Sequence, residues 1–225
     1  MHLIQEEIKP LLSVQHLQIK NQQQVLVEDL SFELKQGETL AIVGESGSGK
    51  SISSLALIGL LPQNLQISGE ALFQNKNLLT LNQQVLQSIR GQHIAMIFQE
   101  PMTALNPLHR VEKIIGEPLL LKGNSKQEVR LKTIQLLNDV GLSDAEAKLR
   151  RYPHELSGGQ RQRVMIAAAL ALEPDILIAD EPTTALDVTL QAQVLDLLKS
   201  LIQQRNMAMI LISHDLNLVR HYAQQ

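Results

Sequence analysis

Short apolar runs and longer amphipathic segments alternate along this chain. The runs have strand length and are rich in Val, Ile and Leu, whereas the longer segments place apolar side chains at three- and four-residue steps, which is typical of helices. We expect strands at 14–19, 30–34, 39–43, 69–73, 94–98, 176–179 and 209–212, and helices at 52–61, 158–172 and 188–204. Apolar strands that alternate with helices predict an α/β fold with a parallel sheet covered on both faces.

The stretch between the strands at 94–98 and 176–179 is mostly helical. From Val111 to about Arg150, apolar residues such as Val129 and Leu137 recur at helical spacing. This block is long and interrupts the alternation of strands and helices. We therefore expect residues 108–172 to form a helical lobe inserted into a single domain that spans residues 1–225.

A glycine-rich segment links the apolar run at 39–43 to the helical pattern at 52–61. Its residues fit the pattern G-x-x-x-x-G-K-[ST]: Gly44, Glu45, Ser46, Gly47, Ser48, Gly49, Lys50 and Ser51. The glycines let backbone N–H groups wrap around a polyphosphate, and the positive end of the following helix favours the same charge. In such a loop Lys50 reaches the β- and γ-phosphates and Ser51 binds Mg²⁺. The alternative, a turn with a surface lysine, is weakened by the strand before the loop and the helix after it.

Composition narrows the class of protein. The chain has 225 residues, 44% of them hydrophobic, and no apolar run approaches the roughly 20 residues that a membrane-spanning helix needs. Acidic residues stand near the N-terminus where a signal peptide would be basic. Without cysteine there is no disulfide and no thiolate metal site. The formal net charge of −3 argues against nucleic acid as a partner.

Two acids end the apolar run that begins at Ile176. Asp180 and Glu181 are predicted to emerge at the carboxyl end of a parallel strand, where α/β proteins bind ligands. Asp180 suits Mg²⁺, because this ion prefers oxygen ligands, and Glu181 suits a base that orients the water attacking a γ-phosphate. Considered by itself, the pair would indicate only a strand that ends in solvent at a charged turn. Downstream of a phosphate loop in the same sheet, the catalytic interpretation is favoured.

A second glycine-rich segment stands at the start of a helix. Leu156 is followed by Ser157, Gly158, Gly159 and Gln160, directly before an alanine-rich helical pattern. Such a start is a second anion-binding site, and one nucleotide does not need two from one chain. We therefore expect a head-to-tail dimer in which each site combines one phosphate loop with the partner's LSGGQ segment.

With these motifs in order, the chain resembles the ATP-binding cassette (ABC) ATPases over nearly its whole length. The resemblance adds Gln99 as the Q-loop glutamine, the D-loop of Ala185, Leu186 and Asp187, and His214 as the switch histidine. It implies a P-loop NTPase fold, with a RecA-like parallel sheet core, N-terminal antiparallel strands and an inserted α-helical lobe that carries the signature. It also implies that Ser51, Gln99 and Asp180 bind Mg²⁺, and that Glu181, His214 and Lys50 act in ATP hydrolysis. The signature residues and Asp187 would then serve the partner's nucleotide.

The segments 98–107, 152–163 and 181–188 resemble the dipeptide/oligopeptide/nickel importer branch, nearest to the N-terminal cassette of the microcin C/peptide importer type. This resemblance implies an ATP-hydrolysing subunit that powers uptake of peptides or similar small solutes. Its partners would be a second cassette, transmembrane permease subunits and, indirectly, a periplasmic solute-binding protein. It would lie peripherally on the cytoplasmic face of the bacterial inner membrane. A soluble non-transport ABC ATPase should show a long linker or a coiled-coil insertion. A truncated cassette without independent activity remains a further alternative.

The chain departs from the family pattern in two places. The loop after the first strand, residues 20–27, holds no aromatic residue or histidine where the family stacks adenine. We therefore predict weak discrimination between ATP and GTP, with Val25 or Val27 as the other possible adenine contact. The chain also ends soon after His214, where the family continues with further strands, so we expect a C-terminally truncated domain.

Overall fold

The structure is a computed structural model that describes residues 9–184 and 186–224. Ala185 of the expected D-loop lies outside the described residues. The elements follow in the order β1 (Leu12–Lys20), β2 (Val25–Leu34), β3 (Thr39–Val43), α1 (Lys50–Leu57), β4 (Gln66–Phe73), β5 (Lys76–Asn77), α2 (Gln83–Ile89), β6 (Ile94–Ile97), α3 (Pro101–Ala104), α4 (Val111–Leu121), α5 (Lys126–Asp139), α6 (Ala145–Leu149), α7 (Gly158–Ala169), β7 (Ile176–Asp180), α8 (Val188–Arg205), β8 (Ala208–Ser213) and α9 (Leu216–Tyr222). None of the helices in these two ranges is long and apolar enough to cross a membrane.

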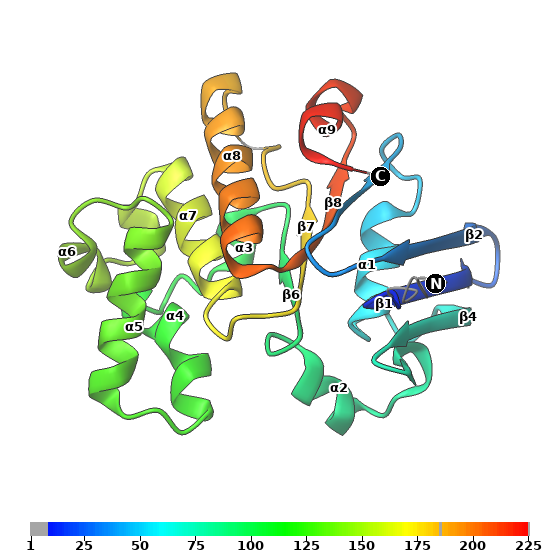
Figure 1. The fold of residues 1–225 in the computed structure, drawn as a ribbon, viewed down its shortest axis with the longest axis horizontal. Helices are drawn as coiled ribbons and strands as arrows, with labels where there is room; N and C mark the ends of the chain where they lie inside the picture. The colour runs from blue at the N-terminus through cyan, green and yellow to red at the C-terminus, as the bar shows by residue number, and fades with distance from the viewer. Residues whose placement is uncertain (1–8, 185, 225) are drawn as a thin grey trace, which may run out of the picture.

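The strands form two sheets that lie side by side (Figure 1). An antiparallel sheet has the order β2-β1-β4-β5, and a parallel sheet has the order β3-β8-β7-β6. The predicted parallel core and N-terminal antiparallel strands are confirmed. All four parallel strands direct their carboxyl ends to one edge, where the phosphate loop, Glu181 and His214 follow β3, β7 and β8.

Alternate residues of the parallel strands face two different hydrophobic cores. In β7, Ile176 and Ile178 pack with the antiparallel sheet and α1, whereas Leu177 and Ala179 pack with α4, α5, α7 and α8. All four side chains are fully buried. Burying an Ile or Leu side chain stabilises a fold by about 1.5–3 kcal/mol, so this strand is a strong anchor for the acids at its end.

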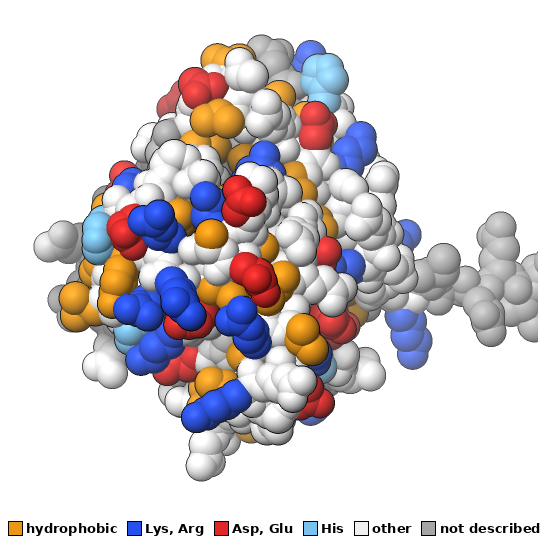
Figure 2. All heavy atoms as spheres, turned by 90° about the vertical axis from the view of Figure 1, so that its left-hand side faces the viewer, with side chains coloured by type: hydrophobic (Ala, Val, Ile, Leu, Met, Phe, Trp, Pro, Cys, Tyr) orange, Lys and Arg blue, Asp and Glu red, His pale blue; other side chains and the backbone are white. Residues whose placement is uncertain are grey.

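Helices α4 to α7 gather on one side of the parallel sheet (Figure 1). The pattern from Val111 to Arg150 reads as one helical block, but the structure divides it into α4, α5 and α6. Gly123, at φ 87°, lies in the turn that connects α4 to α5. A capping box of Ser125 and Glu128 then starts α5. On the outer face Lys and Arg side chains gather around scattered acids (Figure 2). Exposed ion pairs such as Arg130–Glu146 contribute little to stability, so buried packing holds these helices together.

Several element boundaries differ from those predicted, and short helices such as α2 and α3 were not predicted. The helix expected at 52–61 begins at Lys50 and ends at Leu57, because Gly59 (φ 64°) turns the chain. Helix α2 buries only Leu86 and Ile89, so its polar sequence carries no clear amphipathic pattern. A polar turn at 21–24 joins β1 to β2, and Asn21 Oδ1 accepts hydrogen bonds there from the backbone N–H groups of Gln23 and Gln24.

Candidate functional site

The phosphate loop leads directly from β3 into α1. Gly49 precedes the helix in the left-handed region (φ 90°), and no side chain caps the helix start. A Cβ atom at Gly49 would lie 2.6 Å from the carbonyl oxygen of Leu26, so only glycine fits there. Lys50 Nζ donates to the carbonyl oxygens of Gly44 (2.7 Å) and Glu45 (2.6 Å), which places the ammonium inside the curve of the loop. Backbone N–H groups and a buried positive charge therefore converge in this loop.

Ser51 and Asp180 connect the phosphate loop to the end of β7. The Ser51 hydroxyl donates to Asp180 Oδ1 over 3.0 Å, although the two residues are far apart in the sequence. Burial raises the pKa of the Asp180 carboxyl above its ordinary value, and the neighbouring charge of Glu181 acts in the same direction. The Ser51 hydrogen bond and the positive charge of Lys50 act against this increase in pKa. A bound cation would relieve the cost of this buried carboxylate.

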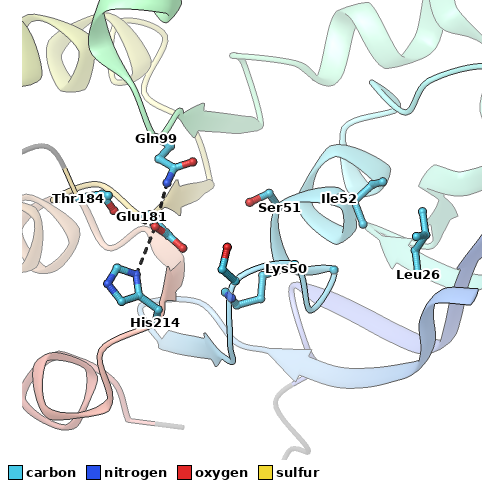
Figure 3. Close-up of a pocket in the computed structure, with 11 residues that line it drawn as sticks. Leu26, Lys50, Ser51, Ile52, Gln99, Glu181, Thr184 and His214 are labelled. Carbon is cyan, nitrogen blue, oxygen red and sulfur yellow. Dashed lines mark hydrogen bonds and ion pairs between the residues drawn. The ribbon is translucent and has the colours of Figure 1, made fainter.

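Glu181 is the meeting point of three other side chains (Figure 3). Its Oε2 atom accepts hydrogen bonds from Thr184 Oγ1 (2.8 Å) and Gln99 Nε2 (3.0 Å), and it lies 3.3 Å from His214 Nδ1. The Glu181 side chain is 13% exposed. Its backbone adopts φ 45°, an unusual value for a residue other than glycine. Strands β6, β7 and β8 thus bring Gln99, Glu181 and His214 together from three places in the sequence.

These groups line one cleft of about 530 Å³. Lys50, Ser51 and Glu181 lie in it together with Gln99, Thr184 and His214, whereas Leu26 and Ile52 lie at the end away from Glu181 (Figure 3). The cleft therefore has a polar end that suits phosphate chemistry and an apolar end that suits a flat organic group. The sequence did not point to Thr184, Leu26 or Ile52 as site residues.

The LSGGQ segment lies elsewhere on the surface. Ser157 caps α7: its Oγ accepts from the Gln160 backbone N–H (3.3 Å), and its own N–H donates to Gln160 Oε1 (3.2 Å). Ser157 and Gly158 are exposed. None of the four residues at 157–160 is among the described residues that line the cleft.

Asp187 also lies outside the lining of the cleft. Its Oδ1 accepts a hydrogen bond from the Leu190 backbone N–H (2.9 Å), so it caps α8. The structure thus brings Lys50, Ser51, Gln99, Asp180, Glu181 and His214 to one edge of the sheet. It leaves the signature residues and Asp187 away from them.

A parallel sheet whose first strand runs through a glycine-rich loop into a helix, with acids at the end of a neighbouring strand, defines a P-loop nucleoside triphosphatase. The ABC transporter family matches residues 27–184, and the chain belongs to this family. It is an ATP-binding cassette.

Curated relatives match this chain closely. It is 53% identical over 222 residues to the peptidoglycan transport ATP-binding protein YejF of Agrobacterium fabrum, which covers 96% of the chain and 41% of the relative. It is 52% identical over 194 residues to the oligopeptide transport ATP-binding protein OppD of Salmonella typhimurium, covering 86% of the chain and 58% of the relative. The chain thus spans about half the length of these relatives. The peptide importer branch expected from the motifs is confirmed.

Solved structures support the fold. CbiO1 of Clostridium perfringens, part of the ABC transporter complex CbiONQ, has a TM-score of 0.81 at 28% identity, covering 96% of this chain and 82% of that one. A dimeric structure of MJ0796, a bacterial ABC transporter cassette in a post-hydrolysis state bound to ADP and Pi, has a TM-score of 0.80 at 30% identity, covering 93% and 90%.

Proposed function

We propose that this chain is the ATP-hydrolysing cassette of an importer that takes up peptides or peptide-containing fragments. The observation that carries the proposal is the cluster at Glu181 Oε2, which faces the phosphate loop across one cleft. The relatives that transport oligopeptides and peptidoglycan indicate the class of solute. The cassette comprises the sheet core and the helical lobe at 108–172.

We assign a role to each group of residues that lines the cleft. The N–H groups of residues 44–51 and the Lys50 ammonium bind the phosphates, because both are positive and converge in the loop. Glu181 accepts a proton from the attacking water, and Gln99 and Thr184 hold its carboxylate in place. His214, which is more than half exposed, contacts the γ-phosphate from the open side. Leu26 and Ile52 pack against the nucleobase of the nucleotide.

The residues at Ser51 fit a magnesium ion. A hydroxyl, a buried carboxylate and the amide of Gln99 are oxygen donors of the kind that Mg²⁺ prefers, and this ion takes its remaining ligands from phosphate and water. Ser51, Asp180 and Gln99 would hold it, and it would neutralise charge that develops on the phosphates. The raised pKa of Asp180 is consistent with a carboxylate designed to face a cation.

The glycines at 158 and 159 support a site shared between two cassettes. A Cβ atom at Gly158 would meet no heavy atom within 4 Å, and one at Gly159 would make only ordinary contact with Leu190. Glycine in a helix costs about 0.5–1 kcal/mol relative to alanine, and packing within this chain does not require it. An approaching phosphate from a second cassette does require the space. MJ0796 was solved as a dimer, and we propose the same assembly here, with Ser157, Gly158, Gly159, Gln160 and Asp187 serving the partner's nucleotide.

An apolar groove beside Gln99 supports docking to transmembrane permease subunits. Phe98 and Leu60 are 39% and 44% exposed and line a groove of about 350 Å³ with Ile114 and Pro118 of the lobe. A short apolar segment of a permease would bury these side chains and touch both halves of the cassette at once. The protein would then lie peripherally on the cytoplasmic face of the membrane, and a periplasmic solute-binding protein would deliver the solute.

Phosphate release from ATP tests the proposal. We expect Glu181→Gln to lower turnover by about 10²–10⁴-fold while ATP still binds, because the amide keeps the shape but cannot accept the proton. Glu70→Gln, the same chemical change at an exposed position of β4, should leave turnover unchanged. Turnover of Glu181→Gln within threefold of wild type in the complete complex would contradict the assignment. Uptake of labelled peptide into vesicles that contain the permease should fall with ATP turnover.

A further inference from the structure

A single buried side chain ties the signature helix to the turn that follows Glu181. Gln162 lies in the second turn of α7 and is 2% exposed. Its amide Nε2 donates a 2.6 Å hydrogen bond to the carbonyl oxygen of Pro182, the residue after Glu181. The helix that carries Ser157 is therefore connected directly to the backbone that carries the catalytic carboxylate.

Both ends of this bond are costly to leave unpaired. Pro182 is buried, so its carbonyl oxygen has poor access to water. Gln162 stands among apolar residues of α7 such as Val164 and Met165, where an amide without a partner is strongly unfavourable. The bond therefore fixes the position of Pro182 relative to α7.

Glu181 needs this support because of its backbone conformation. Its φ of 45° lies in the left-handed region, which a residue other than glycine keeps only when its surroundings hold it. On one side, the Glu181 N–H donates to the Ile212 carbonyl of β8 over 3.0 Å. On the other side, Gln162 holds Pro182.

A second glutamine holds the continuation of the same turn. Gln191 of α8 donates from Nε2 to the carbonyl oxygens of Thr183 and Leu186, both over 3.2 Å. Gln191 is partly buried and holds residues on either side of Thr184, whereas Gln162 is buried and holds Pro182, the residue adjacent to Glu181. Of the two, Gln162 is thus placed to set the direction of the carboxylate.

We propose that Gln162 is a positioning residue for the Glu181 of its own chain, acting through the Pro182 carbonyl. The proposal rests on the function proposed above, because it assigns Glu181 as the base. Without the hydrogen bond from Gln162, Pro182 moves, the strained backbone at Glu181 relaxes, and the carboxylate leaves its position beside Gln99 and Thr184. Nucleotide binding by the phosphate loop is untouched.

The first test is Gln162→Leu, which keeps the size of the side chain and removes the donor. Because a misplacement of about 1 Å can cost about 10²-fold in rate, we expect kcat for ATP hydrolysis to fall about ten- to a hundredfold, with KM and ATP affinity within about threefold. Gln203→Leu, the same chemical change at an exposed position of α8, should leave both constants unchanged.

Mixed dimers test which catalytic site Gln162 serves. When Lys50→Ala and Ser157→Arg chains are mixed, the one intact site combines the phosphate loop and Glu181 of the Ser157→Arg chain with the signature of the Lys50→Ala chain. Gln162→Leu added to the Ser157→Arg chain should reproduce the loss of turnover. Added to the Lys50→Ala chain, it should change turnover by less than about threefold. A general weakening of α7 would show the opposite pattern, because the signature of that chain is the one in use.

Gln162→Glu tests the same hydrogen bond in a way that does not depend on whether the fold tolerates leucine at this position. A buried carboxyl has a raised pKa, and its protonated form can donate to the Pro182 carbonyl, whereas its ionised form cannot. The activity of this variant relative to wild type should therefore rise as the pH falls and be lost as the pH rises through that pKa. Thermal unfolding at each pH controls for folding.

The outcomes separate the two proposals. Wild-type protein that binds but never hydrolyses ATP would overturn the proposed function, and the role of Gln162 with it. Active wild type with a Gln162→Leu kcat within threefold would overturn the positioning role alone. So would a loss of ATP affinity equal to the loss of kcat, or a Gln162→Glu activity ratio that does not change with pH.

Discussion

The two glycine-rich helix starts of this chain are built in different ways. Helix α1 follows a left-handed glycine, has no side-chain cap, and has the Lys50 ammonium inside its own loop. The start of helix α7 is capped by its own side chains, since Ser157 and Gln160 each accept a hydrogen bond from the other's backbone N–H group in a capping box. The start of α1 leaves its N–H groups for a ligand of the same chain, whereas the start of α7 is stable without one.

This difference predicts which measurements each site affects. Damage at α1 should appear in a single chain as lost nucleotide binding. Damage at α7 should appear only when two cassettes meet, as lost hydrolysis.

Lys50→Ala and Ser157→Arg should each reduce hydrolysis to background, for different reasons. Lys50→Ala removes the buried charge from the phosphate loop, so the isolated chain should lose ATP binding. Ser157→Arg places a bulky cation at the exposed start of α7, so the isolated chain should still bind ATP. In an equal mixture, roughly a quarter of the wild-type sites would again have both halves intact, because each mixed dimer keeps one. A mixture that is shown to dimerise but recovers no activity would contradict a shared site.

Alanine at Gly49 and at Gly158 should affect stability in opposite directions. Gly49→Ala forces a Cβ atom to 2.6 Å from the Leu26 carbonyl at φ 90°, so we expect a loss of at least about 1–3 kcal/mol in the free energy of unfolding. Gly158→Ala meets open space in a helix and should raise it by up to about 1 kcal/mol. Turnover of Gly158→Ala should nevertheless fall about tenfold or more, because its methyl group meets the partner's phosphate. Denaturant unfolding and phosphate release measure the two effects, and unchanged turnover would remove the argument from the glycines.

Asp180→Asn should stabilise the chain in the absence of magnesium and nucleotide. Burial raises the pKa of Asp180 in the folded state, so wild type loses stability as the pH rises from the ordinary aspartate pKa through the raised value. Asparagine does not ionise, so the advantage of the variant should be present above the raised pKa and disappear as the pH falls below it. Thermal unfolding between pH 4 and pH 8 measures this. The same variant should gain less stability than wild type from added MgATP.

The smallest effect is expected in the relative affinity for adenine and guanine nucleotides. The cleft offers Leu26 and Ile52 at its apolar end and no Phe, Tyr or Trp among its described lining residues. An aromatic pair adds about 0.5–1.5 kcal/mol beyond its buried area, so ATP and GTP should bind within about threefold of each other here. Leu26→Tyr should favour ATP. Asn21→Tyr should have less effect, because Asn21 lies in the β1–β2 turn. A tenfold preference of wild type for ATP would rule this out.

Local chemistry explains what could be predicted from the sequence. The phosphate loop, the acids after β7 and the LSGGQ segment are contiguous, so residue type and neighbouring pattern were enough to find them. Helix α5 also carried a readable start in Ser125 and Glu128, a capping box that would have divided the helical block. Helix α2 has an Asn82 cap but few apolar residues, so periodicity could not detect it.

The parts of the site that depend on packing could not be predicted. Gln162 is one polar residue in a helix, and only the structure shows it buried against the Pro182 carbonyl. Thr184 became a partner of Glu181 because the turn folds back on itself after φ 45°. At the apolar end, Val25 or Val27 was the alternative adenine contact, but Val25 is 53% exposed and Leu26 lines the cleft instead. A one-residue shift along a strand reverses which face a side chain occupies.

The order β3-β8-β7-β6 also determines when the strand before the phosphate loop can pair during synthesis of the chain. Strand β3 ends at Val43, and its pairing partner in the described sheet, β8, begins only at Ala208. At the usual elongation rate of about 5–20 residues per second, the strand that leads into the phosphate loop waits on the order of ten seconds or more for its neighbour. The nascent chain therefore carries β3 as an unpaired, apolar strand until β8 has been made. The nucleotide site becomes complete only after β8 has joined the sheet.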